Sequence, residues 1–305
     1  MKILLTGAAG QLGQELCSRL SPLGALTLVD RSKPTRPAMP CLQADLADPG
    51  QLEMVLQRTD PDLVVNAAAY TAVDRAEQER QEAFSVNADL PGRIARWAAR
   101  HDRAVLHYST DYVFDGSVGR PYRETDSPCP LNAYGESKLA GERAVAEGGC
   151  RALLVRTSWV YSAHGNNFVL SMLRLAGQRL RLSVVNDQVG CPTWARNLAD
   201  ASLRLLTARL GQVRQGTTET YHYCDRDAVS WYDFAARVFA GAMEFGLLNA
   251  APELSPVASA DYPQVARRPA YSVLDTTSIR AAAGVSPAPL AASLHQCLEE
   301  LAANE

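Results

Sequence analysis

Tyr134 and Lys138 are the two residues of this sequence whose types and spacing most clearly indicate chemistry. They stand four positions apart in "YGESK" (134–138), so on a helix their side chains share one face. The chain has only three lysines among its 30 lysine and arginine residues, which makes this pairing rare by chance. A neighbouring cation makes a phenol, whose ordinary pKa is about 10, a stronger acid. The pair predicts a proton donor with its supporting cation; an exposed Tyr and Lys on a solvated helix is the alternative.

A hydroxyl group is expected near this phenol. Ser109, Thr110 and Asp111 end the apolar run "AVLHYST" (104–110), whose length suits a buried strand. In an open parallel sheet, ligands bind beyond the carboxyl ends of the strands. The end of this strand should therefore lie over the same site, where a hydroxyl such as that of Thr110 can hold a substrate carbonyl in line with the phenol.

Three glycines follow the first apolar run, in "LLTGAAGQLGQEL" (4–16). The run suits a buried strand, and Leu12 begins a leucine repeat at helical spacing, so the order is strand, turn, helix. Gly7 allows a tight turn, Gly10 lets a pyrophosphate approach the amides of the helix N-terminus, and Gly13 lets the helix pack on the strand. This spacing predicts a dinucleotide site, with a glycine-rich turn that binds no ligand as the alternative.

Asp30 strengthens the dinucleotide interpretation. It ends the next apolar run (26–29), about 20 residues beyond the glycine turn, where an acid can bond a ribose 2′-hydroxyl. Asp30 alone favours NADH because it repels a 2′-phosphate, but Arg31 and Lys33 follow it and can attract one. Both NADH and NADPH therefore remain open.

Composition limits the class of protein. The 305 residues are 47% hydrophobic, enough to bury a sizeable core, and the net charge of −3 gives no reason to expect nucleic acid. No apolar run reaches the roughly 18 residues of a membrane helix, and the strand that starts after Lys2 leaves no room for a signal peptide. The five histidines have no zinc-ligand spacing. Seven scattered cysteines predict reduced thiols in the cytoplasm (17, 41, 129, 150, 191, 224, 297).

The alternation of apolar runs and helical patterns predicts an α/β fold, a Rossmann-type doubly wound parallel sheet with a smaller C-terminal substrate-binding lobe. The expected strands include 62–70, 104–110 and 152–161, and the expected helices include 76–84, 89–100 and 137–147. Beyond residue 160 the rhythm becomes irregular, and 250–270 is rich in Pro and Ala. We therefore assign 1–160 with part of 190–230 to the dinucleotide-binding domain, and 161–189 with 231–305 to the substrate-binding lobe.

Motifs in the same order over most of the chain carry a resemblance to a known family. The glycine turn, "NAAA" (66–69), "YSTDYVF" (108–114) and "YGESKLAGE" (134–142) resemble the extended short-chain dehydrogenase/reductase superfamily. Four further motifs resemble one family within it, the dTDP-4-dehydrorhamnose reductases: "RTSWVY" (156–161), "NNF" (166–168), "NDQVGCPT" (186–193) and "RRPAYSVLD" (267–275). The resemblance implies reduction of the C4 keto group of dTDP-4-dehydro-6-deoxy-L-mannose by NADPH or NADH, giving dTDP-L-rhamnose for cell-surface polysaccharide.

The same resemblance implies which residues bind the cofactor, from its diphosphate through adenosine to the nicotinamide. The diphosphate would lie on Gly10, Gln11 and Leu12. Asp30 would adjoin the adenosine ribose, and Asp45 and Leu46 would flank the adenine. The middle of the cofactor would contact Ala69, Tyr70 and Thr71, and its nicotinamide half would lie beside Tyr108.

For the reaction itself, the resemblance implies that Tyr134 protonates the C4 oxygen as hydride arrives at C4. Lys138 would bond the nicotinamide ribose and lower the pKa of Tyr134, while Thr110 orients the carbonyl.

For the substrate, the resemblance implies that Asp111 and Trp159 contact the hexose, with a core aromatic as the alternative for Trp159. Arg268 would meet the substrate diphosphate, which suits its planar fork, with a surface role as the alternative.

Two further implications concern assembly and rival functions. Some relatives form homodimers bridged by magnesium through acidic residues, for which Glu15, Glu299 and Glu300 are candidates, with solvated charges as the alternative. A nucleotide-sugar 4,6-dehydratase is rejected because Tyr112, not a carboxylate, follows Asp111. A non-catalytic regulatory or binding subunit of the same fold stays the alternative function.

Overall fold

Seven parallel strands form the central sheet of the chain, which a computed structural model describes over residues 1–32 and 40–304. Their order in the sheet is β11-β6-β5-β4-β1-β2-β3, with every neighbouring pair parallel. The strands are β1 (Lys2–Thr6), β2 (Ala25–Asp30), β3 (Cys41–Gln43), β4 (Leu63–Asn66), β5 (Ala104–Thr110), β6 (Arg151–Thr157) and β11 (Thr218–His222). The order reverses between β1 and β4, which opens a crevice at the carboxyl ends of the strands. The predicted doubly wound α/β fold is confirmed.

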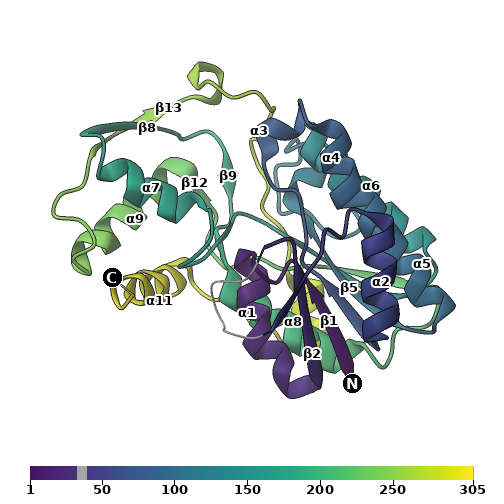
Figure 1. Cartoon of the computed structure of the whole chain (residues 1–305). Helices are drawn as coiled ribbons and strands as arrows, with labels where there is room; N and C mark the ends of the chain where they lie inside the picture. The colour runs from purple at the N-terminus through teal and green to yellow at the C-terminus, as the bar shows by residue number, and fades with distance from the viewer. Residues whose placement is uncertain (33–39, 305) are drawn as a thin grey trace.

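Helices cover both faces of this sheet (Figure 1). One face carries α1 (Gln11–Leu20), α8 (Ala195–Arg209) and α10 (Thr277–Ala283), and the other carries α2 (Pro49–Thr59), α5 (Leu90–Arg100) and α6 (Ala133–Glu147). All seven residues of β5 are buried, as expected for a central strand that is covered on both sides. The sequence assignment placed 231–305 in the smaller lobe, whereas Ile279 of α10 and Val285 pack into the core of the large sheet.

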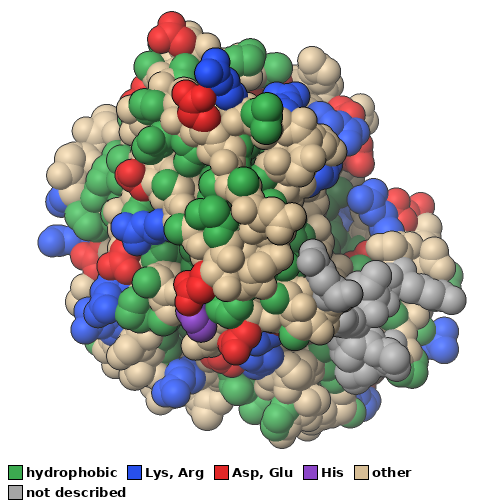
Figure 2. All heavy atoms as spheres, turned by 90° about the vertical axis from the view of Figure 1, so that its left-hand side faces the viewer, with side chains coloured by type: hydrophobic (Ala, Val, Ile, Leu, Met, Phe, Trp, Pro, Cys, Tyr) green, Lys and Arg blue, Asp and Glu red, His purple; other side chains and the backbone are tan. Residues whose placement is uncertain are grey.

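A smaller lobe lies at the carboxyl ends of the strands, on the left of Figure 1. It contains α7 (Phe168–Ala176), β8 (Arg181–Val185), α9 (Trp231–Glu244), β13 (Glu253–Val257) and α11 (Leu290–Ala302). Its core gathers buried side chains such as Val169, Phe234 and Leu294, and β8 pairs with β13 in parallel. Figure 2 views the molecule from this side, where hydrophobic side chains are interspersed with charged side chains of both signs.

Several predicted elements differ in detail from those in the structure. The run 152–161 is not one strand, because β6 ends at Thr157 and β7 (Val160–Tyr161) pairs instead with β10 (Thr193–Trp194). The predicted helix 76–84 is two short helices, α3 (Val73–Ala76) and α4 (Arg80–Phe84). Within residues 1–32 and 40–304, no helix has the length and apolar character that crossing a membrane requires.

Candidate active site

Two cavities run along the carboxyl ends of the strands and meet at the glycine turn. The larger, of about 480 Å³, is lined by the predicted catalytic residues, and the smaller, of about 280 Å³, by Asp30, Asp45 and Leu46. Gly10 and the segment 67–69 line both cavities, which makes them one continuous groove. An extended dinucleotide fits such a groove because its two halves would lie on opposite sides of the glycine turn.

Two of the three glycines of the turn, Gly7 and Gly13, are required by their surroundings. Gly7 has φ +69°, and a Cβ there would lie 2.5 Å from the amide nitrogen of Ala68. At Gly13 a Cβ would lie 2.0 Å from the carbonyl oxygen of Gly7, so helix α1 packs on the turn only without a side chain. Gly10 is the N-cap of α1 and offers no side-chain cap, which leaves the first amides of the helix facing the larger cavity. The site can hold an anionic diphosphate there.

Asp30 connects the glycine turn to the smaller cavity. Its carboxylate accepts hydrogen bonds from the backbone amides of Ala9 at 2.9 Å and Ser32 at 3.0 Å. Arg31 lines the same cavity and forms an exposed ion pair with Glu82 at 3.8 Å. Lys33, the other candidate for a 2′-phosphate, lies outside the described residues.

The residues after β4 divide between the cavity and the protein interior. Ala69 and Thr71 line the larger cavity. Tyr70 lines neither cavity, because its hydroxyl donates to the carboxylate of Glu79 at 2.5 Å and its amide donates to Asn87 at 2.9 Å. The Tyr70 side chain therefore does not lie in the groove, where the predicted contact with the cofactor would require it.

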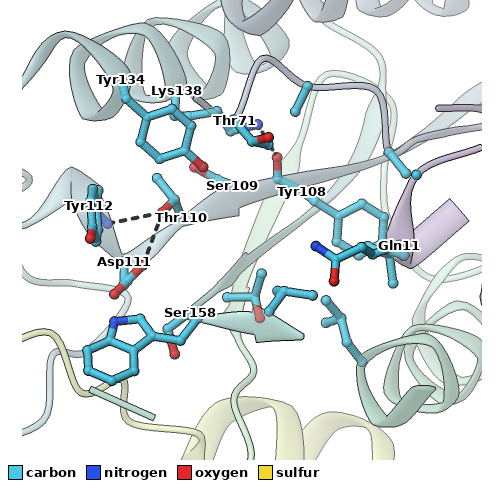
Figure 3. A pocket seen from close by; sticks show the side chains of 18 of the residues that line it. Gln11, Thr71, Tyr108, Ser109, Thr110, Asp111, Tyr112, Tyr134, Lys138 and Ser158 are labelled. Atoms are coloured by element: carbon cyan, nitrogen blue, oxygen red, sulfur yellow. Dashed lines mark hydrogen bonds between the residues drawn. The ribbon is translucent and has the colours of Figure 1, made fainter. Parts of the chain in front are cut away.

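Helix α6 positions Tyr134 and Lys138 as predicted, on one face and inside the larger cavity. Asn132 caps the helix by accepting the amide of Gly135 at 2.8 Å. Gly135 permits a close approach, since a Cβ there would lie 2.2 Å from the carbonyl oxygen of Tyr112. Figure 3 shows the result: the phenol of Tyr134 points to the end of β5, where Ser109 and Thr110 lie.

Lys138 is buried, and its ammonium group donates to the carbonyl oxygen of Tyr108 at 2.6 Å. Burial lowers the pKa of Lys138 to about 8. Burial also raises the pKa of Tyr134 to about 12, against a smaller lowering effect of the neighbouring Thr110 hydroxyl. The expected lowering of the pKa of Tyr134 by Lys138 is not seen, because the ammonium contacts the backbone of β5 and desolvation of the phenol dominates.

Thr110 and Asp111 form the opposite wall of this part of the cavity. The Thr110 hydroxyl donates to one carboxylate oxygen of Asp111 at 3.0 Å, and the other oxygen is buried without a partner in the described part of the chain. Burial raises the pKa of the Asp111 carboxyl to about 7. Such a group accepts or donates a hydrogen bond near neutral pH, which suits contact with a sugar hydroxyl.

The remaining substrate candidates lie differently. Trp159 lines the larger cavity. Arg268 lines neither cavity, because Asp74 of α3 holds its guanidinium through two bonds of 2.7 and 3.1 Å. Contact of Arg268 with a substrate diphosphate remains a prediction that this arrangement does not support.

Sequence reasoning missed residues that complete the site. Asn167 caps α7 and also donates to the side-chain carbonyl of Gln11 at 2.9 Å, which ties the glycine turn to the smaller lobe. The "NNF" motif was the available signal, although no role was assigned to it. Trp231 also lines the larger cavity, and as an isolated residue it gave no signal. Ser109, which the sequence placed at the strand end over the site, lines this cavity as well.

The sequence model of one protein family, described as the RmlD substrate binding domain, matches residues 1–303. The chain belongs to this family. It is 41% identical over 305 residues to a dTDP-4-dehydrorhamnose reductase of Burkholderia thailandensis, covering 99% of both chains. It is also 43% identical over 276 residues to the enzyme of that name from Escherichia coli, covering 90% of both. Among solved structures, the chain is similar to a Bacillus anthracis dTDP-4-dehydrorhamnose reductase in complex with NADP, with a TM-score of 0.82, 32% identity and full coverage of both chains.

The magnesium ion that the resemblance implies does not fit the acidic residues of this RmlD family member. Glu15 is buried on α1, not solvated, and its carboxylate accepts from Arg19 at 3.2 Å and Arg196 at 3.1 Å. Arg196 also bonds Glu300 of α11 at 2.5 Å, and a ring nitrogen of His164 belongs to the same group. Arg19 also pairs with Asp200 at 2.9 Å, so two arginines already bond the carboxylates of this group, and a magnesium ion would have to compete with them for the same oxygens.

We expect the melting temperature and oligomeric state to be unchanged by EDTA or magnesium, because Arg196 already supplies the cation. Arg196→Ala should lower the free energy of unfolding by about 2–4 kcal/mol, since it leaves a buried carboxylate with fewer partners. Added magnesium should raise the melting temperature of this variant alone. Glu299 is exposed and outside the group, so Glu299→Gln is the control. Loss of stability or dissociation of the wild-type protein in EDTA would contradict this account.

Proposed function

We propose that this chain reduces the C4 keto group of dTDP-4-dehydro-6-deoxy-L-mannose with NAD(P)H, which yields dTDP-L-rhamnose for cell-surface polysaccharide. The observation that carries the proposal is the meeting of Tyr134, Lys138 and Thr110 in one groove with an uncapped helix N-terminus. The identity with named reductases along the whole chain supports the choice of substrate. The seven free thiols suit a cytoplasmic enzyme.

The residues of the groove fit a nicotinamide dinucleotide, which when bound supplies a hydride to C4 of the sugar. The open amides after Gly10 would hold its diphosphate, and Lys138 would reach its ribose hydroxyls. Tyr134 holds a proton on its phenol oxygen for transfer to the C4 oxygen. Thr110 orients the carbonyl next to that phenol.

Turnover of the proposed substrate tests the function directly. We expect the purified protein to oxidise NADPH or NADH only when the 4-keto sugar nucleotide is present, with dTDP-L-rhamnose as the product by nuclear magnetic resonance. If no keto sugar supports oxidation while a synthetase copurifies with the chain, the non-catalytic binding subunit becomes the better account.

Cofactor preference should depend on Asp30. Asp30→Ala removes a negative charge and a ribose acceptor, so the ratio of kcat/KM for NADPH to that for NADH should rise by about tenfold or more. Asp30→Asn is the matched variant, because its amide oxygen can still accept from Ala9 and so keep the turn in place. An unchanged ratio in both variants would mean that Asp30 does not adjoin the adenosine ribose.

A further inference from the structure

Trp159 and Trp231 stack face to face on the wall of the larger cavity. Their ring centroids lie 3.4 Å apart with an interplanar angle of 4°, and both residues line the cavity. Trp231 is the first residue of α9, and its ring also meets Phe168 at 4.6 Å. Ser230 and Asp233 fix the start of that helix through a capping box. Trp231 is therefore held on a rigid element.

Both faces of the Trp159 indole are covered. A Cβ built on Gly190 would lie 2.5 Å from Cε2 of Trp159, and 2.7 and 2.8 Å from the flanking Nε1 and Cζ2. A point nearest to Cε2 and almost equally far from its two neighbours lies over the ring face, not beside its edge. Because Trp231 fills the space over one face, Gly190 must lie over the other. Only the edge of the Trp159 ring is left to meet a ligand.

Trp159 is also held in an uncommon backbone conformation. Its φ is +46°, a left-handed conformation that costs a bulky residue about 1–2 kcal/mol. The carbonyl oxygen of Trp159 accepts from the amide of Thr193 at 3.1 Å, at the start of the β7–β10 pairing. Within residues 1–32 and 40–304, its Nε1–H forms no hydrogen bond and is not buried. The surroundings therefore fix the ring and leave its one donor free.

We propose that Trp231 is a positioning residue for the substrate sugar: by stacking on Trp159 it presents the edge of that indole, with its Nε1–H donor, to the hexose. This inference rests on the proposed function, because it takes the hexose to lie against Trp159. A sugar offers hydroxyl oxygens that accept from such a donor, and packing of its ring on either face of Trp159 is blocked. Trp231 acts on the sugar half of the ligand and not on the nucleotide or the cofactor.

Binding of two related ligands tests this assignment without turnover. Trp231→Leu removes the aromatic ring and keeps an apolar side chain, so the Kd for dTDP-L-rhamnose should rise about tenfold, while the Kd for dTDP and for NADPH changes less than about twofold. In turnover, KM for the keto sugar should rise on the same scale, with kcat little affected. Trp231→Phe keeps a stacking ring and should restore most of the affinity.

Circular dichroism supplies the structural readout, because the electronic transitions of stacked indoles couple. Of the four tryptophans, only Trp159 and Trp231 stack on each other within residues 1–32 and 40–304. The far-ultraviolet exciton couplet should be present in the wild type and absent in Trp231→Leu. Trp97→Leu is the matched control, since Trp97 stacks on His101 away from the cavity; it should retain the couplet and the sugar affinity.

The proposal is overturned if Trp231→Leu loses the couplet yet binds dTDP-L-rhamnose like the wild type. It is also overturned if the wild type binds dTDP-L-rhamnose no more tightly than dTDP. By contrast, tight and Trp231-dependent binding of dTDP-L-rhamnose without any turnover would contradict the proposed function but not the role of Trp231 in positioning the sugar.

Discussion

Tyr134→Phe should lower kcat by about 10² to 10⁴-fold while NADPH still binds with nearly wild-type affinity. The change keeps the ring, and with it the packing against Tyr112, whose ring lies 5.8 Å away in an edge-to-face arrangement. It removes the phenol proton, and no other proposed acid points at the same place. Because burial raises the pKa of Tyr134 to about 12, the phenol stays protonated throughout the neutral range, so the loss should be uniform from pH 6 to pH 8.

Stopped-flow oxidation of NADPH in a single turnover measures the chemical step of this variant, and fluorescence titration measures cofactor binding. Tyr221→Phe is the matched control, because its hydroxyl bonds Glu219 on β11 and the residue lines neither cavity. Near-normal single-turnover rates in Tyr134→Phe would remove Tyr134 from the role of proton donor.

Features that depend on neighbours close in sequence could be predicted. The glycine turn needs Gly7 and Gly13 because a strand passes directly into a helix, and that order is visible in the apolar pattern. Likewise, the four-residue spacing of Tyr134 and Lys138 was enough to place them on one face of α6. Local geometry of this kind follows from φ, ψ and helical periodicity, which the sequence carries directly.

Features that depend on distant partners could not be predicted. For Glu15 the sequence left a magnesium ligand or a solvated charge open, but Arg196, 181 residues away, lies beside it and neutralises it. Tyr70 turns out of the groove because Glu79 accepts its hydroxyl, and the sequence does not say which way a side chain in a loop will turn. Trp231 belongs to the cavity only because the smaller lobe, in which α9 packs, meets the carboxyl ends of the large sheet.

Lys138→Arg should abolish most activity although it conserves charge, with an effect comparable to that of Lys138→Met. The Lys138 side chain is only 3% exposed, and its ammonium lies 2.6 Å from the carbonyl oxygen of Tyr108. A guanidinium is planar and wider, so it cannot take this position without displacing the cofactor ribose or the phenol. We therefore expect the Kd for NADPH to rise and kcat to fall by at least about tenfold each.

The pH dependence separates the two cations further. In the wild type, burial lowers the pKa of Lys138 to about 8, so the ammonium loses its proton as pH rises through that value and turnover should fall with it. Arginine stays charged at every accessible pH, so the residual activity of Lys138→Arg should lack this alkaline limb. Initial rates with saturating substrate from pH 6 to pH 10 measure both profiles.

Because arginine occupies all but three of the 30 Lys and Arg positions, a site that needed charge alone would be expected to carry an arginine. If Lys138→Arg kept wild-type kcat and wild-type NADPH affinity, the scarcity of lysine would carry no information about this site, and the compact ammonium would not be the feature that the reaction requires.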